Sequence, residues 1–194
     1  EAVYLLREFD DVELRVQTLL DLPLPALPRL TAQEINVHNY VAANAFARGV
    51  ELGLRALAEV GWQYPATEAA CGERLASEAV ELDEWFAGNP AALDHLPADP
   101  APEHLILDAL QMQMIICAGF GNRPLLMGLS TVRALAELRR RGALTQVAPL
   151  LICSCTSLWS LLTGMYRRAA AWVAPAARAL ERTSPAFLSE CLYY

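Results

Sequence analysis

Residues 30–65 predict two amphipathic helices joined by a tight turn, and this pattern constrains the fold more than any other in the chain. Thr31 and Glu34 have the spacing of a capping box, with Leu30 and Ile35 as its hydrophobic staple. The first helix is therefore predicted to begin at Thr31. A turn is expected at Asn44-Ala45, and Gly61 is expected to end the second helix. Such a pair is the smallest unit of an α-helical repeat.

Two glycines on the second predicted helix indicate that another helix packs closely against it. Gly53 costs about 1 kcal/mol of helix propensity relative to alanine, and close packing would explain why it is there. Together with Gly49 it forms a strip of small residues. The apolar face of this helix is expected to bury Phe46, Val50, Leu54, Leu57 and Val60.

The rest of the chain continues with helical periodicity and no alternating strand pattern. Proline is expected to keep residues 22–28 (LPLPALP) and the connector at residues 88–102 out of helices, and Pro175 predicts a kink or a break. A connector as long as residues 88–102 is usually functional or mobile. Further helices are predicted at residues 2–20 with a break near Asp10-Asp11, 67–87, 103–120, 124–141, 147–163, 165–182 and from 185 onward.

These segments predict one all-α domain over residues 1–194, with about eight to nine helices. Helical pairs of similar length favour an α-solenoid of antiparallel, tetratricopeptide-like pairs. An irregular helical bundle is the alternative. Because the chain begins without methionine, within a predicted helix, we expect it to be an excerpt of a longer protein.

The composition excludes several kinds of chemistry. All 15 basic side chains are arginines, so the segment cannot supply the lysine of a P-loop, of a kinase or of a Schiff base. A net charge of −7 argues against nucleic acid as a partner. Five cysteines without paired spacing are expected to be buried free thiols of a cytoplasmic protein.

Residues 142–166 carry no charge and are flanked by arginines, so they could span or contact a membrane. Their serines and threonines would make a poor lipid-facing helix, and arginines on both sides give no orientation signal. We therefore favour a buried helix. A membrane-associated segment is the alternative.

The sequence predicts no catalytic, cofactor-binding or metal-ligating residue, and no cofactor. His95 and His104 lie near several carboxylates and suggest a metal or small-molecule site, but their spacing fits no known ligand pattern. We expect these histidines to be solvated or to stabilise a helix end. Ser130 does not lie in a nucleophile elbow. The carboxylates near the two histidines are those of Asp94, Asp99, Glu103 and Asp108.

A separate acidic face is predicted on the helix at residues 67–87. We expect it to be solvated, with docking of a basic partner as the alternative. It comprises Glu73, Glu78, Glu81, Asp83 and Glu84.

Four stretches, in order, resemble one protein family. ARGVELGLRALAEVGWQYP (47–65), EWFAGNPAALDHLPADPAPEHLILDAL (84–110), NRPLLMGLSTVRALAELRRRG (122–142) and TGMYRRAAAWVAPAARALER (163–182) are similar to the tetratricopeptide-like region of large multidomain signalling ATPases. Those proteins join a Ser/Thr-kinase-like domain, an AAA-type signal-transducing ATPase, the helical region, a GAF domain and often a histidine kinase. The chain departs from them at Pro175 and in lacking lysine.

The resemblance implies a non-catalytic, regulatory helical arm that follows an ATPase. Such an arm senses a small-molecule effector or a protein partner, or contacts neighbouring domains of its own chain. The family's catalytic residues lie in other domains, so none is transferred to this sequence.

Overall fold

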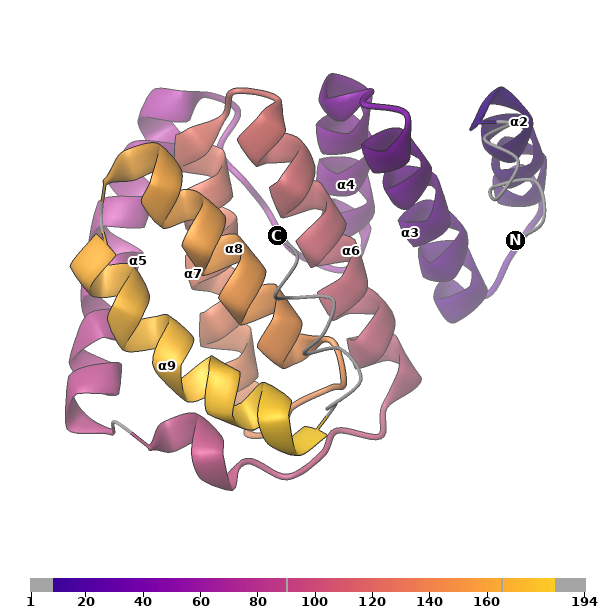
Figure 1. The fold of residues 1–194 in the computed structure, drawn as a ribbon. Coiled ribbons are helices and arrows are strands. Elements are labelled where there is room, and N and C mark those ends of the chain that lie inside the picture. Colours follow the sequence, from indigo (N-terminus) through magenta and orange to yellow (C-terminus); the bar gives the residue numbers. More distant parts are fainter. Residues whose placement is uncertain (1–8, 90, 165, 184–194) are drawn as a thin grey trace.

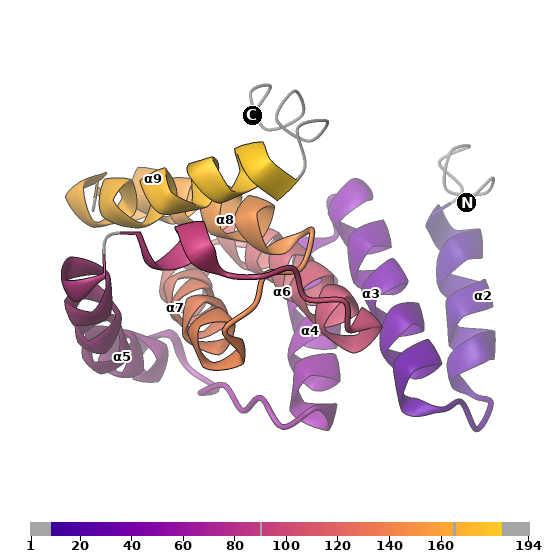
Figure 2. The same ribbon diagram turned by 90° about the horizontal axis from the view of Figure 1, so that it is seen from below.

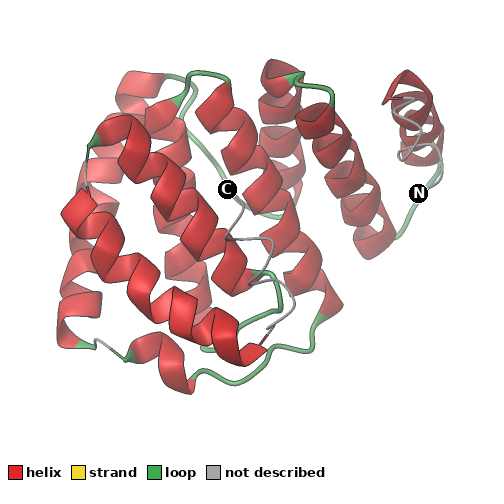
Figure 3. Cartoon of the chain, in the orientation of Figure 1, coloured by secondary structure: helices red, strands yellow, loops and turns green. Residues whose placement is uncertain are grey.

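The computed structural model describes residues 9–89, 91–164 and 166–183, and this part of the chain is almost entirely helical (Figures 1 and 3). The predicted all-α class is confirmed for it. One isolated parallel β-bridge joins Ala98 and Leu144. The helices are α2 (Phe9–Leu20), α3 (Ala26–Ala42), α4 (Phe46–Glu59), α5 (Glu68–Gly88), η1 (Ala92–His95, a 3-10 turn), α6 (Pro102–Phe120), α7 (Pro124–Arg141), α8 (Ala148–Thr163) and α9 (Tyr166–Thr183).

Several helix ends follow from local sequence signals. Pro124 is the first residue of α7, where its missing N–H has no helical partner to lose. Gly142 ends the same helix at φ 65°, a left-handed conformation that glycine adopts without a steric penalty. Thr67 caps α5 by accepting a hydrogen bond from the Ala70 N–H. The turn predicted at Asn44-Ala45 also lies between two helices, α3 and α4.

The predicted start of α3 at Thr31 is wrong, because the helix already begins at Ala26. Pro28 falls in the first turn, where the N–H groups have no helical acceptor, so proline is tolerated there. Thr31 therefore lies inside the helix, and its hydroxyl donates to the Leu27 carbonyl at 2.9 Å. The predicted staple is wrong as well, since Ile35 is exposed.

The glycine strip of α4 packs closely on α6, as predicted. A Cβ atom on Gly49 would lie 2.3 Å from Cys117 Sγ, and one on Gly53 would lie 2.5 Å from Met114 Cγ. Only glycine allows the two helices to approach so closely. The expectation that Val60 is buried is wrong, because the helix ends at Glu59 and leaves Val60 exposed.

Helix α6 is the centre of the packing. It contacts α3, α4, α7 and α8, and the core contains its residues Leu110, Met114, Ile115 and Cys117. Helix α5 packs mainly on α7, and α9 packs on α8 and η1. Several major contacts therefore join helices that are not consecutive. Figure 2 shows α2, α3 and α4 side by side, with α2 outermost.

Helix α2 begins at Phe9 and continues through Asp10 and Asp11, and residues 2–8 of the helix predicted at residues 2–20 lie outside the described part of the chain. It buries its apolar side on α3 in a small cluster of Val12, Val16 and Ala32, separate from the main core. Burying a valine side chain stabilises a fold by roughly 1.5–3 kcal/mol. Among the described residues, the buried apolar contact that holds α2 is therefore small.

Near the C-terminus, α9 continues through Pro175, and the break predicted there is wrong. Proline removes the donor for the carbonyl of Ala171, an exposed residue, so water can donate to that carbonyl instead. The helix predicted from residue 185 onward lies outside the described residues. Residues 142–147 precede α8 as a loop. None of the helices described is long and apolar enough to cross a membrane.

Two of the described cysteines, Cys71 and Cys117, are buried free thiols, as the sequence predicts. Burial raises the pKa of Cys117 to about 12, which keeps this thiol protonated at neutral pH. Cys153, on α8, is half-buried.

Candidate functional site: a buried carboxylate–arginine cluster

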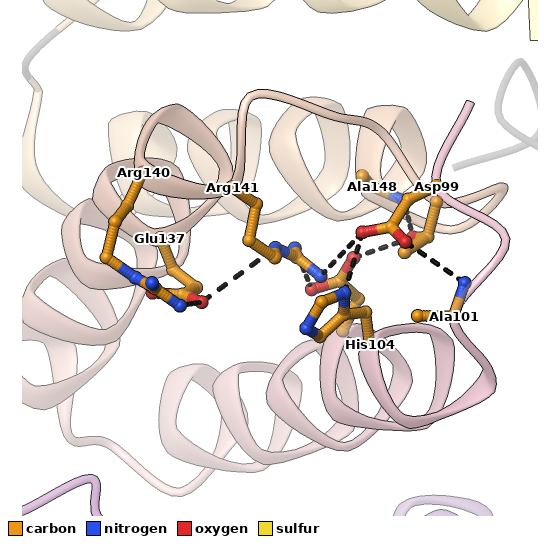
Figure 4. Close-up of polar contacts among 9 residues, drawn as sticks. Asp99, Ala101, His104, Glu137, Arg140, Arg141 and Ala148 are labelled. Atoms are coloured by element: carbon orange, nitrogen blue, oxygen red, sulfur yellow. Dashed lines mark hydrogen bonds and ion pairs between the residues drawn. The ribbon is translucent and has the colours of Figure 1, made fainter. Parts of the chain in front are cut away.

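The most charged part of the protein interior is centred on Asp108, in the second turn of α6. Its carboxylate accepts from Arg141 Nη2 at 2.6 Å through one oxygen and from the Thr145 hydroxyl at 2.6 Å through the other. The side chains of Asp108 and Arg141 are only 1% and 3% exposed. The pair links α6 to the end of α7, and Thr145 extends it toward α8. Figure 4 shows Arg141 between Glu137 on one side and Asp99 and His104 on the other.

Asp99 brings the connector of residues 88–102 into the same cluster. One of its oxygens accepts from the Ala101 N–H at 3.0 Å, and the other lies 2.8 Å from Nδ1 of His104. The same oxygen lies 3.8 Å from Arg141 Nη1, a distance at which the charges attract without forming a hydrogen bond. His104, in the first turn of α6, is partly exposed.

Glu137 and Arg140 form the outer edge of the cluster. Glu137 lies one turn before Arg141 on α7, and its carboxylate is 3.9 Å from Arg141 Nε. Arg140 donates to both Glu137 oxygens, at 2.7 and 2.6 Å. Arg140 is largely exposed whereas Arg141 is buried, so two adjacent arginines occupy different environments.

The electrostatics of the two aspartates differ. Burial raises the pKa of Asp108, and the attraction of Arg141 and the hydrogen bond from Thr145 oppose this effect. Burial also acts to raise the pKa of Asp99. There, however, the Ala101 N–H, His104 and Arg141 together outweigh it and lower the pKa.

Backbone contacts reinforce the cluster. The Leu144 N–H donates to the Pro97 carbonyl at 2.9 Å, and the Asp99 N–H donates to the Leu144 carbonyl at 2.8 Å. Thr145 Oγ1 also accepts from the Ala148 N–H, the first amide of α8, at 3.1 Å. Residues 97–101 are therefore bound between the start of α6 and the loop from α7 to α8.

The first half of the connector is bound as well. Leu93 of η1 is buried in the main core, and Asp94 forms an ion pair with Arg178 of α9 at 3.1 Å. The sequence predicts that this connector is functional or mobile. In the structure, its described residues make specific contacts with α6, α9 and the loop before α8.

Of the residues that suggested a metal or small-molecule site, the structure brings three together: Asp99, His104 and Asp108. Asp94 pairs with α9 instead, and His95 and Glu103 are exposed. The remaining histidine, His38 on α3, lies 3.1 Å from Gln113 Nε2 of α6. Within the part of the chain that the structure describes, no group of three or more histidine, cysteine, aspartate and glutamate side chains is arranged to hold a metal ion.

The sequence pattern does not identify Arg141 and Thr145 as members of the cluster. Arg141 ends a run of three arginines in the last turn of α7, where arginine also complements the helix dipole. A signal for its partner was present, because Asp108 is the one charged residue between His104 and Phe120. An acid in such an apolar helix needs a buried partner. Which cation provides it cannot be read from the spacing, since Arg141 is 33 residues away.

A second charged contact joins α5 to α7. Arg133 donates to both oxygens of Glu78, at 2.8 Å each, and to the Gln63 carbonyl. Its guanidinium also lies 5.0 Å from the centre of the Tyr64 ring. These contacts hold the loop between α4 and α5 against α7.

The cluster around Asp108 is arranged to hold segments together. Both oxygens of Asp108 are occupied by donors from the protein itself, and Asp99 binds both a backbone amide and an imidazole. Four segments thus meet at one buried set of charges.

No protein-family model, curated protein or solved structure matches this chain.

Proposed function

We propose that the chain is a non-catalytic helical module that binds a protein partner, or a neighbouring domain of its own chain, within a larger cytoplasmic signalling protein. The observation that supports this most is the exposed ring of Phe120, at the end of α6. Phe120 is 62% exposed, and its ring stacks on that of Phe46 at 5.3 Å. A fixed, exposed aromatic ring is typical of the residues that dominate binding energy at protein interfaces.

The position of this ring favours a macromolecular partner. Phe46 begins α4 and Phe120 ends α6, so the stacked pair lies where two closely packed helices end side by side. Tyr40 of α3 packs near the same end, under the guanidinium of Arg48 at 4.8 Å. Aromatic and arginine side chains are enriched at protein interfaces.

The state of the buried charges supports a non-catalytic role. Asp108 and Arg141 use their charges on each other, and Asp99 is held by His104 and a backbone amide. Groups committed to internal contacts stabilise the fold. We extend the proposal to a tetratricopeptide-like repeat, and the adjacent packing of α2 on α3 and of α3 on α4 supports this extension.

Site-specific photocrosslinking in cells that express the complete protein tests the proposal. A benzophenone amino acid at position 120 should crosslink to one defined partner or neighbouring domain. The same probe at Tyr166, which is 60% exposed at the start of α9, is the matched control. Crosslinks at neither position, or the same products at both, would contradict the proposal.

The partner identified in this way allows a quantitative check. Phe120→Ala should weaken its affinity by roughly tenfold or more, because removing an interface anchor costs about 1.4 kcal/mol or more. Tyr166→Ala should leave the affinity unchanged. Since both side chains are exposed, both variants should keep wild-type helicity by circular dichroism.

A further inference from the structure

Within the described part of the chain, helix α2 is attached through a small apolar contact with α3. Its buried side chains, Val12 and Val16, form with Ala32 a cluster separate from the main core, with Leu20 packed at its edge. Polar contacts join the same helix to α3 and α4. Arg48 of α4 pairs with Glu13, and Arg29 of α3 donates to the Leu20 carbonyl at 3.3 Å.

The face of α3 that receives α2 is itself partly polar. Ala32, Asn36 and Asn39 follow each other at helical spacing on this face. Asn39 is 1% exposed and its Nδ2 donates to the Phe9 carbonyl at 2.9 Å. The Oδ1 atoms of Asn36 and Asn39 are buried without a hydrogen-bond partner. The interface thus has a small apolar centre beside incompletely satisfied amides, and this weakens the attachment of α2.

The link between the two helices, residues 21–25, is short and contains two prolines. The chain reverses at Pro23, where the Leu24 N–H donates to the Leu22 carbonyl at 2.8 Å. Pro25 is already extended, with φ −57° and ψ 159°. Leu22 and Leu24 both precede proline, which biases them toward extended backbone. Breaking the turn at Pro23 would let the link extend, and its two prolines would keep the extended link stiff.

We propose that α2 exchanges between two copies of this chain, so that α2 of each copy occupies the α3 face of the other. This inference is independent of binding through Phe120. A second copy has the same sequence and therefore fits this face of α3. It supplies Val12 and Val16 to pack on Ala32, and the Phe9 carbonyl to accept a hydrogen bond from Asn39. Exchange of an element joined by a short hinge is a low-cost route to a symmetric dimer.

Sedimentation of the purified chain from micromolar to millimolar concentration tests for the dimer. The wild type should pass from monomer to dimer over this range. Val16→Asp, which places a charge in the buried cluster, should remain a monomer. Leu14→Asp is the matched control on the same helix, because Leu14 is 65% exposed and outside the cluster, and it should dimerise as the wild type does. A wild type that stays monomeric throughout would overturn the proposal.

A complementation experiment distinguishes exchange from any other dimer. Val16→Asp damages α2 but leaves the α3 face intact, whereas Ala32→Asp damages the face but leaves α2 intact. Each variant alone should be monomeric, and an equimolar mixture should form a heterodimer that is weaker than the wild-type dimer. Dimers of either variant alone, or a mixture without heterodimer, would contradict exchange of α2.

The hinge provides a third measurement. Pro23→Gly gives the link more freedom to fold back, so it should raise the dimer dissociation constant by roughly threefold or more. An unchanged constant would count against the role given to the hinge. Circular dichroism at low concentration shows whether each variant keeps the helical content of the monomer.

Discussion

Asp108 and Arg141 form an ion pair at 2.6 Å in which both side chains are almost completely buried. They come from helices that pack on each other at the centre of the fold, and Thr145 occupies the second oxygen of the aspartate. Removing one partner leaves a buried charge without compensation, whereas removing both does not. This asymmetry makes the pair accessible to experiment.

Arg141→Met should lower the free energy of unfolding by about 3–5 kcal/mol, because it leaves Asp108 buried and unpaired. The double variant Asp108→Leu with Arg141→Met should recover part of this loss. Urea denaturation followed by circular dichroism measures both. Arg140→Met is the control, and it should change stability by about 0.5 kcal/mol or less because Arg140 is 72% exposed. A double variant less stable than Arg141→Met would contradict this account.

The stability of the protein should fall on acidification partly through Asp99. Its folded-state pKa is lowered, so the folded state binds its proton less readily than the unfolded state does. The contribution of Asp99 to the free energy of unfolding is present above the ordinary aspartate pKa of about 3.9, and it is lost as the pH falls through the lowered pKa.

Asp108 changes the pH dependence of stability in the opposite direction. Its folded-state pKa is raised, so its contribution to the free energy of unfolding is greatest at low pH. This contribution declines as the pH rises from the ordinary aspartate pKa to the raised pKa. Urea midpoints measured from pH 2 to 6 should therefore fall less on acidification in Asp99→Asn than in the wild type. A steeper acid loss in the variant would exclude this role for Asp99.

Gly49→Ala should destabilise the protein although alanine favours helix. The new Cβ would lie 2.3 Å from Cys117 Sγ, and overpacking of this kind costs about 1–3 kcal/mol. Adding Cys117→Ala removes the sulfur atom and should restore part of the stability. Gly88→Ala is the control, since nothing lies within 4 Å of a Cβ at that position. Thermal denaturation compares the four proteins, and a neutral Gly49→Ala would show that α4 and α6 are farther apart.

Two threonines test where helices begin. Thr67→Ala should cost about 0.5–2 kcal/mol, because it removes the side-chain acceptor for the Ala70 N–H at the start of α5. Thr31→Ala should be nearly neutral, because Thr31 lies within α3 and its hydroxyl bonds only to a carbonyl that is already in the helix. Chemical denaturation measures both changes. A loss at Thr31 as large as that at Thr67 would favour a helix start at Thr31 instead.

By itself the sequence determined the helices and many of their ends. Proline and glycine restrict the backbone at their own positions, so Pro124 and Gly142 mark the limits of α7 without information from the rest of the fold. The close approach of a helix at Gly49 and Gly53 could also be predicted, because glycine inside a helix indicates that a neighbouring segment leaves no room for a side chain. The identity of that neighbour, α6, could not.

Only the tertiary structure decided the long-range relationships. In the folded protein α5 packs on α7, and Asp108 lies beside an arginine 33 residues away. Local propensities act over one or two turns of helix, whereas the partner of a buried charge depends on how whole helices are arranged. Helical periodicity places Asp108 on a face of α6, and the arrangement of α7 against that face makes Arg141 its partner.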